Sequence, residues 1–265
     1  MEALPAQPST ITAFLAFEVG RGRRASTLGR RLAAIQFCHE SAGYEPPTNA
    51  QVVRATLRGI RRTLGTAPNR KAPATAGLAK AMARSYSVSL IGLRYRAIVL
   101  LGFAGALRRS ELVALDVADI ETTEKGLLVR ISRSKTDQEA EGVIVAISRG
   151  STDCPAEALL AWLKVAGIVE GSVFRSISRS GKISAKRLSG RTITNIVKRH
   201  AGRVGLNAKK FSAHSLRSGF LTSAAANGAS VFKMMEVSRH KSIDTLRTYI
   251  RSAELFKDHA GHGLL

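Results

Sequence analysis

Apolar residues recur at helical spacing over residues 11–64. They lie three or four positions apart in Ile11–Phe17, between Leu28 and Ile35, and in Val52–Arg62. An apolar stripe at this spacing is typical of a helix that packs one face against a core. Several arginines occupy the polar positions between the apolar ones. The pattern predicts a group of helices at the start of the chain.

The next segment, residues 65–75, has two prolines and no apolar periodicity, so we interpret it as a linker. Helical spacing resumes after it and continues to about Leu115. This part contains the longest apolar run of the chain, Ala97–Leu107, which is too short to span a bilayer and predicts a buried helix. We therefore expect two domains, at residues 1–70 and 71–265.

Two runs rich in β-branched residues follow, Leu127–Ile131 and Val143–Ile147, with the charged segment Ser132–Gly142 between them. Such runs on either side of a polar turn predict an antiparallel hairpin. From Ala156 onward the spacing is helical again, interrupted at a few glycines. The expected fold class is mainly α with a small antiparallel β-sheet (α+β).

The net charge of the chain indicates what kind of partner it binds. The chain has 41 Lys and Arg against 19 Asp and Glu, a net charge of +22 and a pI near 11.1. Residues 171–235 contain thirteen Lys or Arg and no Asp or Glu. A segment of this kind repels itself unless it faces phosphates, so nucleic acid is the first partner to expect.

The two cysteines and the N-terminal residues bear on the cellular compartment of the protein. Cys38 and Cys154 show no metal-ligand spacing, and the N-terminus has neither a basic nor an apolar signal region. We expect a reducing cytoplasm, no structural metal and no membrane partner.

Tyr249 stands out because residues 239–252 surround it with arginines and a lysine, and His240 precedes it by nine positions. Positive charge nearby favours the phenolate form, which suits a nucleophile. The alternative is a tyrosine at the rim of an amphipathic helix, half buried and half wet.

Two further pairs lie at helical spacing. Arg108 and Glu111 fall on one helix face, where the carboxylate could orient the guanidinium, and His214 and Arg217 fall on another. Each pair alone is expected by chance. A second H-x-x-R match begins at His200.

Taken together and in this order, the patterns resemble the tyrosine recombinase (phage integrase) family: G-x-L-R-x-x-E-L, a lysine in a β-turn, H-x-x-R, then His and Tyr nine apart. His214 lies 35 residues before Tyr249, an interval typical of the family, whereas His200 lies 49 before it. The resemblance covers the catalytic half throughout. The helical first half is similar to the core-binding domain of Cre-like members.

The resemblance implies a catalytic role for one set of residues: Arg108, Lys135, His214, Arg217, His240 and Tyr249. The two arginines match those that clamp the scissile phosphate, and Lys135 matches a hairpin lysine that serves as general acid. Tyr249 matches the nucleophile. No cofactor or metal is implied.

The implied function is site-specific DNA recombination and integration through a 3′-phosphotyrosine, by a homotetramer assembled on two double-stranded DNA sites. The expected source is a bacterium, a phage or a mobile element. Family members usually have one more helix before the segment that begins here at Pro8, so we expect a truncated N-terminal domain. A type IB topoisomerase and a non-catalytic DNA-binding protein stay open as alternatives. The tail with Leu255 and Phe256, which could dock on a neighbouring subunit, favours the recombinase.

Overall fold

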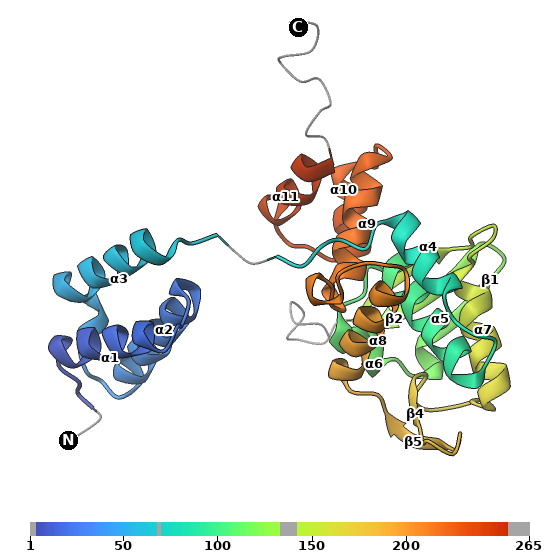
Figure 1. Ribbon diagram of the computed structural model, residues 1–265, viewed down its shortest axis with the longest axis horizontal. Coiled ribbons are helices and arrows are strands. Elements are labelled where there is room, and N and C mark those ends of the chain that lie inside the picture. Colours follow the sequence, from blue (N-terminus) through green and yellow to red (C-terminus); the bar gives the residue numbers. More distant parts are fainter. Residues whose placement is uncertain (1–3, 68–69, 133–141, 254–265) are drawn as a thin grey trace, which may run out of the picture. The chain divides into compact units, whose positions relative to one another are not determined.

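The computed structural model describes residues 4–67, 70–132 and 142–253 (Figure 1). Within these ranges the protein is mainly helical and carries two small antiparallel sheets, which confirms the predicted α+β class. The chain divides into two compact units, Met1–Arg70 and Lys71–Leu265. Each unit has its own hydrophobic core.

Three helices build the first unit: α1 (Pro8–Gly20), α2 (Ala25–Ser41) and α3 (Gln51–Leu64). Proline suits the first position of α1 because the first N–H groups of a helix have no partner within it. The apolar faces of the three helices meet in a core made of Ile11, Leu15, Leu28, Leu32 and Val53. Cys38, on α2, is exposed, whereas Cys154, in the second unit, is buried.

Helix α5 (Leu90–Ala104) is contacted by most other helices that are described in the second unit. Its residues 97–102 are all buried, so the prediction of a buried helix in the longest apolar run is confirmed. The helices that contact α5 are α4 (Ala76–Arg84), α6 (Arg109–Ala114), α7 (Pro155–Ala166), α8 (Gly190–Arg203) and α9 (His214–Ala226). Two further helices, α10 (Val231–Ser238) and α11 (Ile243–Ala253), pack on α9.

A three-stranded sheet lies beside these helices, with β1 (Ile120–Thr123), β2 (Gly126–Ile131) and β3 (Val143–Ser148) in antiparallel order. The predicted hairpin of β2 and β3 is confirmed, with Leu127 paired to Ile147. Alternate residues of both strands face the core. The short strand β1 was not predicted.

The expectation of helix throughout the chain after Ala156 is wrong between α7 and α8. Here β4 (Arg175–Ile177) and β5 (Ile183–Arg187) form a second antiparallel hairpin. Ile177 pairs with Ile183 across a turn in which Gly181 has a φ of 81°. Strands this short, with cations at most outer positions, leave too few apolar residues to show a period of two.

The second half of the predicted linker packs on the second unit. The Ala74 N–H donates to the Ser215 carbonyl over 2.8 Å, and Ala74 is fully buried. Gly219 makes this approach possible, because a Cβ at that position would stand 1.8 Å from the Ala74 oxygen. The chain is therefore fixed on α9 just before α4 begins.

Candidate active site

Five of the six predicted site residues lie together in the second unit. The His214 ring meets the Tyr249 hydroxyl, and the Arg217 guanidinium meets the His240 ring. Arg108 lies close enough to act electrostatically on His214, Arg217 and His240. The sixth residue, Lys135, lies outside the described residues. The five come from α6, α9, α11 and the end of α10.

Arg108 is positioned by the turn that ends α5. Ala106 adopts φ 45°, its N–H donates to the Phe103 carbonyl, and the next N–H donates to that of Gly102. This pair of hydrogen bonds around a left-handed residue is a Schellman motif, which ends the helix sharply. Arg108 then falls at the N-cap of α6, at the edge of the site.

Glu111 holds Arg108 in place, as the sequence predicts. The Arg108 Nη1 donates to Glu111 Oε1 over 2.6 Å, and the Arg108 N–H donates to Oε2 over 2.8 Å. The Glu111 side chain is fully buried. Burial opposes ionisation of the carboxyl, but Arg239 and Arg108 outweigh it, so the pKa of Glu111 lies below its ordinary value.

Arg217 lies in the first turn of α9 and is 2% exposed. Its Nη1 donates to the Ala106 carbonyl over 2.6 Å, and its Nη2 lies 3.3 Å from His240 Nε2. Burial, followed by the charges of Arg108 and Arg239, lowers the pKa of Arg217 to about 9. The guanidinium still keeps its proton at neutral pH.

The two histidines are held neutral. Burial, followed by the charge of Arg217, lowers the pKa of His240 to about 4. Desolvation, then Arg217 and Arg108, also lowers the pKa of His214, although this residue remains exposed at the start of α9. A neutral imidazole can accept a proton, and His214 is the ring that lies beside the Tyr249 hydroxyl.

Tyr249 is presented from α11. Its hydroxyl lies 3.3 Å from His214 Nε2, and its ring centroid lies 6.4 Å from that of His240. Leu246, one helical turn earlier, is fully buried against α9 and α10, with the Tyr249 ring partly buried beside it. The amphipathic helix therefore fixes the direction of the phenol, and the partly buried ring agrees with the reading of a tyrosine at the rim of a helix.

Arg239 belongs to the cluster and was missed by the sequence analysis. It is the C-cap of α10, in the left-handed region at φ 55°, and its guanidinium turns inward. Its Nη2 donates to Glu111 Oε2 over 2.6 Å, and the two side chains are 6% and 0% exposed. Glu111 is thus shared by Arg108 and Arg239. Only the adjacency of Arg239 to His240 could have signalled this contact.

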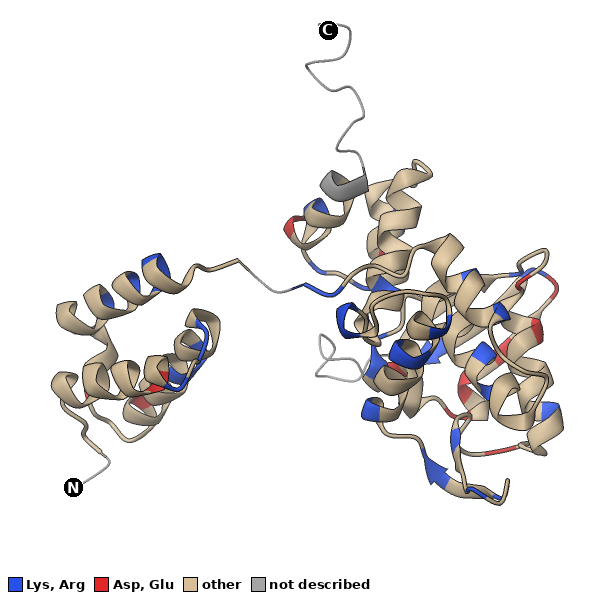
Figure 2. Cartoon of the chain, in the orientation of Figure 1, with Lys and Arg blue, Asp and Glu red and all other residues tan. Residues whose placement is uncertain are grey.

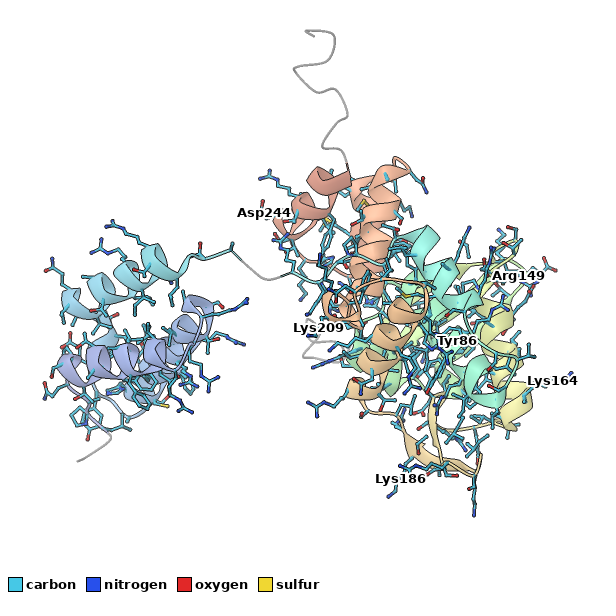
Figure 3. The ribbon with its side chains drawn as sticks, viewed as in Figure 1. Tyr86, Arg149, Lys164, Lys186, Lys209 and Asp244 are labelled. Atoms are coloured by element: carbon cyan, nitrogen blue, oxygen red, sulfur yellow. The ribbon has the colours of Figure 1, made fainter. Side chains whose placement is uncertain are left out.

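The second H-x-x-R match leads to a different place. His200 is fully buried between Tyr86 and Tyr95, with its ring centroid 3.6 Å from that of Tyr86. Figure 3 labels Tyr86 in the second unit. Burial, followed by the charges of Arg203 and Arg199, lowers its pKa to about 4. It is a core histidine at the junction of α4, α5 and α8.

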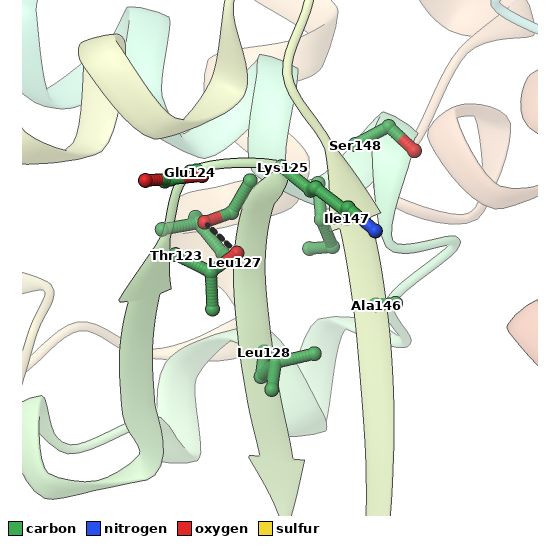
Figure 4. A pocket seen from close by; sticks show the side chains of 9 residues that line it. Thr123, Glu124, Lys125, Leu127, Leu128, Ala146, Ile147 and Ser148 are labelled. Atoms are coloured by element: carbon green, nitrogen blue, oxygen red, sulfur yellow. Dashed lines mark hydrogen bonds between the residues drawn. The ribbon is translucent and has the colours of Figure 1, made fainter.

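An open hollow on the three-stranded sheet is separate from the cluster of the five site residues. Its lining comes from the β1–β2 turn and the facing parts of β2 and β3, and none of the five site residues contributes to it (Figure 4). Among the described residues, no group of three or more His, Cys, Asp or Glu could hold a metal ion. Over the same ranges, no helix has the length and apolarity needed to cross a membrane.

The sequence matches the phage integrase family over residues 76–255. It is 36% identical over 263 residues to an integrase/recombinase XerD homolog of Selenomonas ruminantium, covering 97% of this chain and 77% of that relative. The solved structure of XerH site-specific recombinase, bound to a palindromic difH substrate, gives a TM-score of 0.72 at 16% identity, covering 98% of this chain and 73% of that one. A lambda integrase dimer bound to a COC′ core site gives 0.61 at 18%, covering 93% and 65%.

The family match and the 36% identical relative define an enzyme class that exchanges DNA strands. The chain belongs to the phage integrase family, the tyrosine recombinases. The predicted family and its recombination function are thereby confirmed.

Proposed function

We propose that this recombinase cleaves and rejoins DNA through a covalent bond between Tyr249 and a 3′-phosphate. The observation that carries the proposal is the Tyr249 hydroxyl, 3.3 Å from His214 Nε2, in a cluster with two arginines. A base beside a hydroxyl, with cations beside both, is the arrangement that nucleophilic phosphoryl transfer requires.

In this mechanism the Tyr249 oxygen attacks the scissile phosphorus while His214 accepts the phenolic proton. The new phosphotyrosine bond forms as the bond to the 5′-oxygen breaks. Arg108 and Arg217 neutralise the charge that develops on the non-bridging oxygens, and both keep fixed protonation states during the step. Lys135, outside the described residues, is proposed as the acid that protonates the leaving 5′-oxygen.

Neither a metal ion nor ATP is needed in this scheme. The guanidinium groups supply the positive charge that a metal would otherwise provide. The phosphotyrosine ester conserves the energy of the diester it replaces, so a second DNA end can attack it and reverse the reaction. Strand exchange is then a sequence of two balanced transesterifications.

We propose double-stranded DNA as the partner of both units. The acid-free segment 171–235 spans β4 to α10 and includes His214 and Arg217, so cations extend from the catalytic cluster onto the surface (Figure 2). In the first unit, α3 directs its arginines to solvent, opposite the apolar face that it buries: Arg54, Arg58, Arg61 and Arg62. We assign residues 1–70 as the core-binding domain and residues 71–265 as the catalytic domain. A tetramer on two sites would complete the exchange.

The direct test is capture of the enzyme on a nicked suicide substrate, in EDTA and without ATP. The intact protein should form a covalent adduct on a denaturing gel, and Tyr249→Phe should form none while still binding DNA. Tyr95→Phe is the matched control, because Tyr95 packs against Tyr86 and His200 away from the cluster. An adduct that persists in Tyr249→Phe, or one that requires Mg²⁺, contradicts the proposal.

A further inference from the structure

Ser238 lies at the last position of α10 and touches His240 from inside the protein. It is fully buried. Its Oγ lies 2.6 Å from the Met234 carbonyl oxygen and 2.8 Å from His240 Nδ1.

The hydrogen bonds that link Met234, Ser238 and His240 allow one assignment of donors and acceptors. A carbonyl oxygen only accepts, so the single proton of the Ser238 hydroxyl goes to Met234. The hydroxyl oxygen must then accept at the 2.8 Å contact, and His240 Nδ1 must carry a hydrogen. In a neutral ring this leaves Nε2 with a free lone pair.

Arg217 contacts both nitrogens of the ring. Its Nη2 lies 3.3 Å from His240 Nε2 and 3.5 Å from Nδ1. Because these two distances are nearly equal, the guanidinium lies over the ring and does not select one nitrogen, and the tautomer is decided by the Ser238 contact. The left-handed turn at Arg239 brings the ring back over the end of α10, which makes the contact between residues 238 and 240 possible.

We propose that Ser238 is a positioning residue that fixes His240 in the tautomer with hydrogen on Nδ1, so that Nε2 keeps a free lone pair. The hydroxyl acts through the histidine and does not itself contact DNA. The Arg217 guanidinium lies against this ring and donates to the Ala106 carbonyl.

A consequence follows that rests on the proposed function. Nε2 can donate to a scissile phosphate only after it takes up a proton. Cationic or titratable groups face the ring from each element packed on it: Arg217 and His214 on α9, Arg108 at α6, Arg239 at α10, and Tyr249 on α11. Burial of the ring, followed by the positive charges of Arg217, Arg108 and Arg239, lowers the pKa of His240 and opposes its protonation in the free protein. A bound phosphate offsets these charges, so DNA binding should be accompanied by proton uptake at His240.

The protein contains a matched control in the histidine outside the site. Ser85 Oγ donates to the Met82 carbonyl over 2.8 Å and lies 2.9 Å from His200 Nδ1. By the same reasoning, His200 carries its hydrogen on Nδ1. The two serine and histidine pairs share their chemistry and differ in location.

Long-range ¹H–¹⁵N NMR of the full-length protein, without DNA and at neutral pH, tests the tautomers. Both His240 and His200 should show a protonated Nδ1 and an unprotonated Nε2, each assigned by substituting that histidine. Ser238→Ala should populate the other tautomer at His240 alone, and Ser85→Ala should do so at His200 alone. A hydrogen on Nε2 of His240 in the intact protein overturns the proposal, even if the variants fail to fold. An unchanged His240 spectrum in a folded Ser238→Ala variant also overturns it.

Single-turnover cleavage separates this proposal from the proposed function. Ser238→Ala should slow cleavage by about ten-fold, the usual loss when a histidine loses its orienting partner, and Ser238→Thr should restore it. Ser85→Ala should cleave at the normal rate. If Tyr249 forms the adduct but Ser238→Ala has no effect on rate or tautomer, only the present proposal fails. If no adduct forms at all, the proposed function fails while the tautomer result stands.

Discussion

At the scale of single residues, the site is organised around one backbone carbonyl and one carboxylate. The Ala106 carbonyl accepts from both Arg217 and Arg239, and Glu111 accepts from both Arg108 and Arg239. Arg239 thus connects the supports of both arginines assigned to the phosphate. The guanidinium groups are held in place before any substrate arrives, which reduces the reorganisation needed during the reaction.

Removing either arginine that we propose to bind the phosphate should affect the chemical step more than DNA binding. We expect Arg108→Ala and Arg217→Ala each to slow single-turnover cleavage by about 10²- to 10³-fold, the usual loss for one transition-state donor. DNA affinity, measured on the same substrate by gel shift, should change much less. An equal loss in affinity and in rate would mean that these arginines are ordinary backbone contacts. Arg149→Ala, beside the β1–β2 turn, is the control expected to leave the rate unchanged.

Arg239 offers a test of the shared carboxylate. Arg239→Met should reduce the free energy of unfolding by about 3 kcal/mol, because a buried carboxylate loses one of its two cations. Arg239→Gly should lose about 1 kcal/mol less than Arg239→Met, because glycine relieves the left-handed backbone at this position. Denaturant unfolding of the three proteins gives the order. If the methionine variant is the more stable one, backbone strain at residue 239 is negligible.

At the scale of elements, α9 is the helix on which the site is built. It begins with His214 and includes Arg217, and α10, α11 and the segment before α4 pack against it. Gly219 lies one helical turn after Ser215, on the side that meets the Ala74 backbone. The packing of this short extended segment therefore depends on the absence of a side chain at one position of the helix.

Gly219→Ala tests this dependence. The added methyl group would meet the Ala74 carbonyl oxygen and carbon at 1.8 and 2.2 Å, so the backbone at residue 74 must move. We expect a loss of about 1–3 kcal/mol in unfolding free energy, typical of overpacking. Gly77→Ala is the matched control, since a Cβ at that exposed position of α4 meets nothing within 4 Å. Equal melting temperatures for the two variants would contradict the close packing.

Elements with long apolar patterns were predictable from sequence, whereas short ones were not. The buried helix α5 and the hairpin of β2 and β3 have enough apolar positions to reveal their period. The β4–β5 hairpin pairs Ile177 with Ile183 but Arg175 with Arg187, and most of its other residues are polar, so its alternation is hidden. Local sequence patterns cannot predict it because its stability comes from the surrounding unit.

The proposed site residues could be predicted from sequence where the family pattern sets their order and spacing. Arg108, His214 and Tyr249 are examples. The pairing of Arg239 with Glu111 spans 128 positions and depends on a left-handed turn, and neither property is visible in a local pattern. The role argued for Ser238 likewise requires knowing where two protons go.

At the scale of the whole molecule, charge is the dominant property. The net charge is +22, and the acid-free segment folds into consecutive elements of the catalytic unit. In Figure 2, cations also lie along α3 of the first unit. A surface of this kind binds a polyanion largely by releasing the counterions that the polyanion holds.

DNA affinity should therefore fall steeply with salt. If the protein neutralises six to ten phosphates, the association constant should drop by about 10³- to 10⁵-fold between 50 and 200 mM salt. Arg58→Gln on α3 should reduce the slope of log K against log salt by about one. Lys164→Gln on α7, outside both the first unit and the acid-free segment, should leave the slope unchanged. A slope that Arg58→Gln does not alter would argue against DNA contact by the first unit.

The distribution of the two cysteines provides a spectroscopic opportunity. Cys38 is exposed on α2 of the first unit, and Cys154 is buried in the second. A thiol-reactive dye added to the unaltered native protein should therefore attach to one site only. With a second dye on the end of a DNA duplex, energy transfer would report the distance between the first unit and that DNA end, with no engineered residue in the chain.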